Sequence, residues 1–215
     1  GQPSDWDNPW ILTDGVHELR TTVSLRQANQ ILYYVTAYRK YFLARFSSWD
    51  LRAPKGKLPI IVTKTQAELK AKIKVVTDKM GGGGGAGMNG IQGAAYYLYT
   101  NSDLNPCFVT YEPTEAGGTT FSIDNFEQLQ IPIAHEVTHQ IVFEYSKYDC
   151  NRMRAIENHF WAVEAIANYM GYHVFDDTSW KLTHPRTIQM GRGLIEGPFA
   201  HCVQNVSSLP NLALF

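Results

Sequence analysis

Cysteine is scarce in this chain of 215 residues, which contains only Cys107, Cys150 and Cys202. Three cysteines are too few for a disulfide scaffold, and no pair has the spacing of a Cys-x-x-Cys motif. The odd number allows at most one bridge within the chain, from Cys150 to Cys202, with Cys107 left buried. Three buried thiols are the alternative, and the sequence leaves both arrangements open.

The chain also lacks an excess of charge and any long apolar run. Nineteen basic and twenty acidic residues leave a formal net charge of -1, so no overall positive field would recruit nucleic acid. No apolar run approaches the roughly 18 to 20 residues that a membrane helix needs. A content of 44% hydrophobic and 18% charged residues excludes an intrinsically disordered chain. We therefore expect a globular protein with no nucleic-acid partner and no membrane span, and the composition indicates no oligomeric state.

Glycine is concentrated in one stretch, between Gly81 and Gly93. This stretch lacks the Gly-Lys-Ser/Thr ending with which a phosphate-binding loop holds phosphate and magnesium. We therefore expect a mobile loop there and no nucleotide site.

We expect a single domain over residues 1–215. Residues 1–15 have the composition of an irregular lead-in, 16–130 form a helix and sheet part, and 131–215 form a helical part.

Capping boxes and apolar periodicity predict the elements before residue 131. One capping box, at Ser24 and Gln27, opens a helix over 25–46 in which apolar residues recur every three or four positions. A second, at Thr65 and Glu68, opens a helix after a buried strand at 58–63. Further strands are expected at 16–23, 95–100, 107–111 and 119–123, the last three forming a small mixed sheet with 58–63.

The chain turns helical at Pro132, which suits a first helical turn. We expect one helix from there to about residue 145 and another over 151–170, ended by Gly171. The sheet should lie beside the first of these helices, with the 25–46 helix packed on the far side as a scaffold.

The helix expected after Pro132 contains an H-E-x-x-H motif, His135-Glu136-Val137-Thr138-His139. Four residues make slightly more than one helical turn, so both imidazoles project from one face and can hold a single metal ion. Glu136 is offset around the helix, where it can accept a proton from water at the metal instead of ligating the ion. The flanking residues are apolar, and polar side chains in a buried helix need partners. The motif therefore predicts a Zn2+ site with Glu136 as general base.

Two histidines leave the site one protein ligand short of a catalytic zinc centre. The next helix offers Glu157, His159 and Glu164. Glu157 can equally be a surface residue, and His159 a core or supporting histidine. Glu164 lies 25 residues beyond His139, enough for a helix end, a turn and a return helix. Asn168, one turn after Glu164 and on the same face, can hydrogen-bond a ligating histidine and fix its orientation.

The motif resembles the gluzincin branch of zinc metallopeptidases, in the thermolysin-like clan, when it is taken together with Trp161-Ala162-Val163-Glu164-Ala165-Ile166-Ala167. In that branch a second helix supplies a glutamate ligand, often within Trp-x-x-Glu-Gly-x-Ala, and here Ala165 replaces the glycine. The family tends to place an Asp one turn after the glutamate, where this chain has Asn168. The order of segments over about residues 16–175 is similar to that of poorly characterised bacterial members.

The resemblance implies an α+β, zincin-like metallopeptidase fold with zinc held by His135, His139 and Glu164. It also implies hydrolysis of peptide bonds, with a peptide or protein substrate lying along an edge strand at 119–123 or 107–111. Export to the periplasm or the exterior of the cell is implied as well.

A peptidase of this kind also needs a hydrogen-bond donor to the oxyanion, which the family takes from a Tyr or His beyond the third ligand. Four such residues are available, of which His201 is preferred: Tyr172, His173, His184 and His201.

Two other functions compete with the peptidase. The first is a catalytically inactive zincin-fold module that keeps the metal and binds protein or glycan. Glu136 argues against it, because loss of that base is the simplest way to inactivate the scaffold. The second is a structural zinc domain, which is disfavoured because such sites usually close with four protein ligands rich in cysteine.

Overall fold

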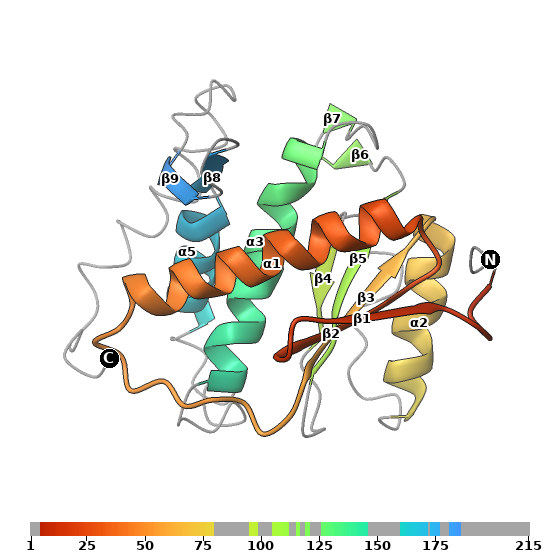
Figure 1. Cartoon of the computed structure of the whole chain (residues 1–215), viewed down its shortest axis with the longest axis horizontal. Helices are drawn as coiled ribbons and strands as arrows, with labels where there is room; N and C mark the ends of the chain where they lie inside the picture. Colours follow the sequence, from red (N-terminus) through yellow and green to blue (C-terminus); the bar gives the residue numbers. More distant parts are fainter. Residues whose placement is uncertain are drawn as a thin grey trace.

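The structure, a computed structural model, describes residues 5–79, 95–98, 105–111, 115–116, 119–120, 126–145, 160–171, 173–176 and 181–185. These residues form a mixed α/β arrangement, with a five-stranded sheet, four helices and two small hairpins (Figure 1). The glycine-rich stretch expected to be a mobile loop lies outside them, as do Cys150 and Cys202. Among the described residues, Cys107 is buried and forms no disulfide.

The main sheet has parallel strands at its centre and an antiparallel strand at each edge. Its order is β1 (Trp10–Thr13), β2 (His17–Thr21), β3 (Leu58–Thr63), β5 (Cys107–Thr110) and β4 (Ala95–Tyr97). β2, β3 and β5 run parallel, whereas β1 pairs antiparallel with β2, and β4 with β5. The strands predicted at 16–23, 58–63, 95–100 and 107–111 are therefore found in the sheet. The prediction that 107–111 is an edge strand is wrong, because β4 covers the outer side of β5.

The strand predicted at 119–123 does not belong to this sheet. Within the described residues, β7 (Thr119–Thr120) pairs with β6 (Glu115–Ala116) in a separate hairpin. The physical reason is local, since the Gly117-Gly118 dipeptide between them is typical of a two-residue hairpin connection. A second separate hairpin joins β8 (His173–Asp176) to β9 (Lys181–Pro185).

β1 corrects the prediction of an irregular lead-in over residues 1–15. Residues 10–13 pair with β2 across a turn at Asp14 and Gly15. Gly15 has a φ of 93°, a conformation that residues with a side chain rarely adopt. Asp14 Oδ1 accepts a hydrogen bond from the main-chain N–H of Val16 at 2.9 Å. An Asp-Gly pair between two apolar runs is a hairpin signal, so this strand was predictable.

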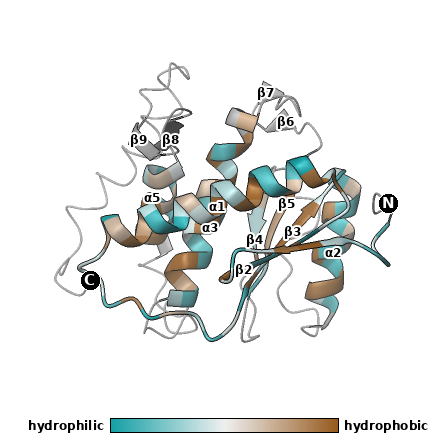
Figure 2. Ribbon diagram, viewed as in Figure 1, coloured by the Kyte–Doolittle hydropathy of each residue, from teal (hydrophilic) through white to brown (hydrophobic). Residues whose placement is uncertain are grey.

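Alternate residues along the strands give the sheet two apolar faces. One face packs under α1 (Leu25–Arg45) and α3 (Phe126–Tyr145), in a core that includes Leu19, Ile60 and Val109. The other face packs against α2 (Gln66–Lys79) in a smaller cluster of Leu69, Ile73, Leu98 and Phe108. Figure 2 shows β3 in brown, as expected for a central strand with both faces covered.

α1 begins with the predicted capping box. Ser24 Oγ accepts a hydrogen bond from the main-chain N–H of Gln27, whose side chain accepts one from the N–H of Ser24. α1 lies on the same face of the sheet as α3 and packs against α3, β1 and β2. The prediction of α1 as a scaffold on the far side is therefore wrong. The helix on the far face is α2, because its apolar residues meet the opposite side of β5.

α3 begins six residues before Pro132, at which the sequence predicts its start. Pro132 cannot donate a hydrogen bond to the carbonyl four residues earlier, so it weakens the helix at this point. Two tyrosines of α1 contact α3 on either side of the proline. The Tyr34 hydroxyl donates to the carbonyl of Gln130 at 3.0 Å, and Tyr38 hydrogen-bonds the side chain of Thr138. These contacts hold α3 against α1 on both sides of the proline.

α5 (Phe160–Gly171) is the described part of the helix predicted over 151–170, and it ends at Gly171 as predicted. It packs against α3 (Figure 1). None of the helices within the described ranges has both the length and the apolar character needed to cross a membrane.

Candidate metal centre

A buried amide holds the motif helix to the sheet. Gln140 Nε2 donates hydrogen bonds to the carbonyl of Pro59 at 3.0 Å and to that of Asn105 at 2.9 Å. Val137 and Ile141, on the same helix, are buried in the main core. These contacts fix the rotation of α3 and leave the two motif histidines on the side that α5 covers.

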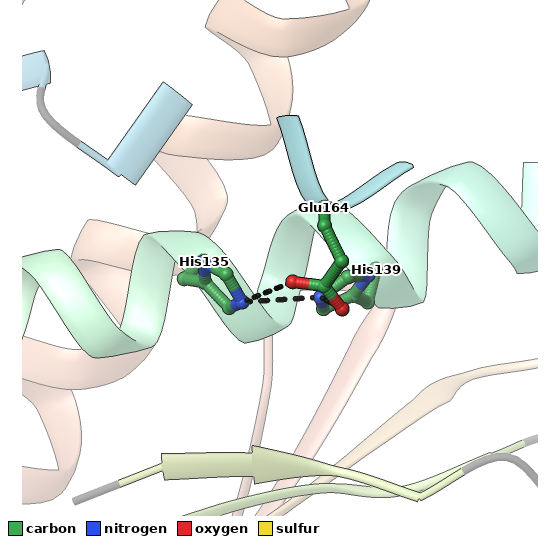
Figure 3. Close-up of side chains that lie close together, drawn as sticks. All are labelled: His135, His139 and Glu164. Atoms are coloured by element: carbon green, nitrogen blue, oxygen red, sulfur yellow. Dashed lines mark hydrogen bonds and ion pairs between the residues drawn. The ribbon is translucent and has the colours of Figure 1, made fainter. Parts of the chain in front are cut away.

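The two imidazoles point toward one another and toward a carboxylate of α5 (Figure 3). His135 Nε2 lies 3.2 Å from His139 Nε2. Glu164 Oε2 lies 3.3 Å from His135 Nε2, and Glu164 Oε1 lies 3.3 Å from His139 Nε2. The structure therefore brings together the three residues that the sequence predicts as metal ligands.

These separations suit a tetrahedral ion. Zinc bonds to imidazole nitrogen at about 2.0 to 2.1 Å and to carboxylate oxygen at about 2.0 to 2.2 Å. Two nitrogens 3.2 Å apart would then subtend an angle of about 100° at the ion, and a nitrogen and an oxygen 3.3 Å apart would subtend about 105°. Both angles are close to the tetrahedral value of about 109°, and three protein ligands would leave one position of a tetrahedral zinc ion for water.

The exposed fractions of the three side chains show that the cluster is reached from one side. The side chain of His139 is 4% exposed, whereas those of His135 and Glu164 are 23% and 32% exposed. His139 therefore forms the inner wall of the cluster, and the other two lie nearer to solvent. The cluster is therefore in contact with solvent on the side of His135 and Glu164.

Small residues allow α5 to lie close to α3. Ala167 is fully buried between Glu164 and the end of the helix. A Cβ atom added at Gly171 would lie 3.3 Å from the carbonyl oxygen of Ile131 and 3.7 Å from the Cβ of His135. A contact of 3.3 Å is tighter than ordinary packing. The absence of a side chain at Gly171 therefore allows α5 to lie this close to α3 beside His135.

The charges of the cluster are complementary. Burial by itself would raise the pKa of Glu164, but hydrogen bonds from His135 and His139 outweigh it and lower this pKa to about 2. Burial by itself would lower the pKa of His135, but the hydrogen bond to Glu164, the nearby Glu136 and the side chain of Asn168 raise it. The carboxylate of Glu164 is therefore ionised at neutral pH, as a metal ligand must be.

Glu136 lies beside the cluster and not in it. Its Oε2 accepts a hydrogen bond of 2.7 Å from the main-chain N–H of Tyr97, at the edge of the sheet. Burial raises the pKa of Glu136, and the two motif histidines oppose that rise. The carboxylate is thus oriented by β4 while it remains next to the histidines, which is the position a general base requires.

The other predicted site residues fall into two groups. Asn168 lies on α5 one turn after Glu164, and its side chain helps to raise the pKa of His135. The alternative ligands Glu157 and His159 lie outside the described residues, as do the preferred oxyanion donor His201 and its alternative Tyr172. The remaining candidates lie in the second hairpin, on β8 and β9: His173 and His184.

Sequence reasoning missed the residues of the sheet edge that contact the motif helix. Tyr97 reaches Glu136 through its main chain and Glu144 through its hydroxyl, at 3.2 Å. Asn105 donates to Glu144 as well. No pattern in the sequence points to these contacts, because they depend on β4 lying at the edge of the sheet beside α3.

A separate pocket of about 560 Å³ lies over α1 and shares no residue with the metal cluster. It is lined by Asp14, Arg26, Asn29, Gln30, Leu32, Tyr33 and Thr36. Among the described residues, its lining contains no group of side chains that could hold a metal ion.

The donor set itself fits zinc. Two imidazole nitrogens, one carboxylate and an open position are the ligands of catalytic zinc sites, whereas magnesium and calcium prefer oxygen ligands alone. Comparison of the chain with protein-family models, with curated proteins and with solved structures finds no match, so the geometry of the site carries the functional argument.

Proposed function

We propose that this protein is a zinc-dependent metallopeptidase of the gluzincin type, with a zincin-like fold. The observation that carries the proposal is the convergence of His135 Nε2, His139 Nε2 and the Glu164 carboxylate on one point, with Glu136 directly beside them. Structural zinc sites usually close with four protein ligands. Within the part of the chain that the structure describes, only three side chains could hold the ion, and the carboxylate of Glu136 lies next to them without belonging to the group. This arrangement supports a catalytic site.

In this proposal each polar group has one task. His135, His139 and Glu164 hold the ion, and Asn168 keeps the imidazole of His135 in its orientation. A bound zinc ion supplies a Lewis acid that activates water and polarises a carbonyl group. Glu136 accepts the proton of the attacking water at its carboxylate and passes it to the nitrogen of the leaving amine.

The sheet edge suits an extended peptide or protein substrate. β4 is the edge strand beside α3, and its residue Tyr97 contacts Glu136 directly. A peptide that adds to a sheet edge is held by main-chain hydrogen bonds, which need no particular side chain. We therefore assign the substrate to the β4 edge, in place of the strands at 107–111 and 119–123.

Two further parts of the proposal come from the resemblance alone. His201 is the candidate that donates a hydrogen bond to the oxyanion at the attacked carbonyl. The enzyme would act in the periplasm or outside the cell, as many bacterial members of the branch do.

The test compares metal content and activity in matched variants. Zinc stoichiometry and cleavage of a quenched peptide library are measured for the wild type, Glu136→Gln and Glu164→Ala. Glu18→Gln, on β2 and away from the cluster, is the control for loss of a carboxylate. We expect Glu136→Gln to retain zinc and to lose a factor of about 10² to 10⁴ in rate, because only the proton acceptor is removed. Glu164→Ala should lose zinc and activity together.

Each outcome decides between functions. A wild type that binds zinc and cleaves no peptide would support an inactive module that binds protein or glycan. A Glu136→Gln variant as fast as the wild type would refute the general-base assignment even with zinc in place.

A further inference from the structure

The carboxylate of Glu136 needs an external constraint to act as a base. The last torsion of a glutamate side chain is broad, so a carboxylate held only by its own chain samples many orientations. Here one oxygen, Oε2, accepts the main-chain N–H of Tyr97 at 2.7 Å. A charge-assisted hydrogen bond of this length fixes the plane of the carboxylate and assigns the second oxygen, Oε1, to proton transfer.

Tyr97 itself is fixed by its ring. The side chain is 2% exposed and stacks between two aromatic rings of α3. Its ring centroid lies 6.5 Å from that of His139, with 12° between the planes, and 6.1 Å from that of Phe143, with 19° between the planes. The ring therefore bridges a metal ligand and the core, and the strand cannot slide along α3 without breaking this stack.

The hydroxyl of Tyr97 completes the constraint. It donates to Glu144 Oε1 at 3.2 Å, and the same oxygen accepts the main-chain N–H of Asn105 at 3.0 Å and its Nδ2 at 2.8 Å. Asn105 lies just before β5, whose Cys107 is the register partner of Tyr97. Glu144 thus joins α3 to both strands, two helical turns from Glu136.

We propose that Tyr97 is a positioning residue for Glu136, held in place by Glu144, so that the sheet edge and not the motif helix alone sets the direction of the general base. This inference rests on the proposed peptidase function. It also gives β4 two tasks, since the strand that would bind the substrate orients the base that acts on it.

The first part of the test needs no enzymatic activity. Hydrogen exchange of the residue 97 amide is measured by NMR in the zinc-loaded full chain. We expect this amide to be protected in the wild type and to lose protection in Glu136→Ala, because its acceptor is gone. Tyr97→Phe and Glu144→Ala should lower the protection as well, by loosening the strand. Tyr96→Phe is the matched control, because the Tyr96 side chain packs on the opposite face of β4, against the α2 cluster. It should leave the exchange of residue 97 unchanged.

The second part measures kcat, KM and zinc content for the same variants. Tyr97→Phe and Glu144→Ala should retain zinc and lose about 2- to 12-fold in kcat, the rate equivalent of one hydrogen bond. Glu144→Gln should recover most of that loss, because its amide oxygen still accepts from Tyr97 and Asn105. A purely structural role would lower the stability of these variants and leave kcat per folded, zinc-loaded molecule unchanged.

The outcomes separate this inference from the proposed function. If Glu136→Ala leaves the residue 97 amide fully protected, or if the variants of Tyr97 and Glu144 turn over like an active wild type, the positioning role is wrong and the peptidase stands. If the wild type cleaves no peptide, the proposed function is refuted, and the positioning role with it.

Discussion

Replacement of Gly171 tests whether the distance between α3 and α5 sets the metal site. A Cβ at this position would lie 3.3 Å from the carbonyl oxygen of Ile131, so alanine requires a shift of a few tenths of an ångström. Valine adds two methyl groups that reach about 1.5 Å further, and we estimate that the helices must separate by about 1 Å at this crossing. Glu164 lies seven residues earlier on α5, about two turns away and on the same face. A displacement of the helix end is therefore carried to the third ligand.

Metal sites tolerate errors of only about 0.2 Å in ligand distance. We therefore expect Gly171→Val to weaken zinc binding by about 10- to 100-fold, the range found when a group that orients a ligand is lost. Gly171→Ala should cost much less. Zinc affinity is measured by competition with a chromophoric chelator, and urea unfolding checks that each variant folds.

The control introduces the same residue at an exposed position of the same helix. Tyr169 is 38% exposed on α5, so Tyr169→Val changes helix propensity without entering the contact with α3. A Gly171→Val protein that binds zinc within twofold of the Tyr169→Val protein would refute the reasoning, because α5 would then be free to adjust.

Two further predictions concern stability. Burial by itself would raise the pKa of Asp14, but hydrogen bonds from His17 and Thr36 outweigh it and hold this pKa well below its usual range. The ionised carboxylate therefore contributes stability that is complete above about pH 5 and is lost progressively as the pH falls from there toward the lowered pKa of the folded state. Asp14→Asn should lower the free energy of unfolding at pH 7 by about 1 to 3 kcal/mol. It should also flatten the fall of this free energy between about pH 5 and 3, which urea unfolding at each pH measures. If the free energies of the wild type and the variant fall in parallel with pH, the prediction is contradicted. Zinc at 100 times its dissociation constant should raise the free energy of unfolding by about 2.7 kcal/mol, an effect that EDTA reverses and Glu164→Ala removes. Equal thermal stability with and without zinc would count against the site.

The elements that could be predicted from sequence are those with local signals. The capping box at Ser24 and the apolar periodicity after it predict α1 to within one residue at its end. The run at 58–63 predicts β3 at its observed bounds. The spacing of His135 and His139 places both imidazoles on one face because it depends only on helix geometry.

The parts that could not be predicted depend on contacts between distant residues. α3 continues through Pro132, and tyrosines of α1, about a hundred positions earlier, contact it on both sides of the proline. The interior position of β5 depends on β4 pairing across its outer side. The hydrogen bond between Tyr97 and Glu136 joins residues 39 positions apart, and no local pattern in the sequence encodes it.

The division of the ligands between two helices has a consequence for the order of assembly. His135 and His139 belong to a helix anchored in the sheet core by Gln140, so their half of the site is complete as soon as that core has formed. Glu164 arrives only when α5 docks on α3. If zinc binds as proposed, a weak complex with two nitrogens would precede a tight complex with three ligands. Tight binding would then require that α5 has docked on α3.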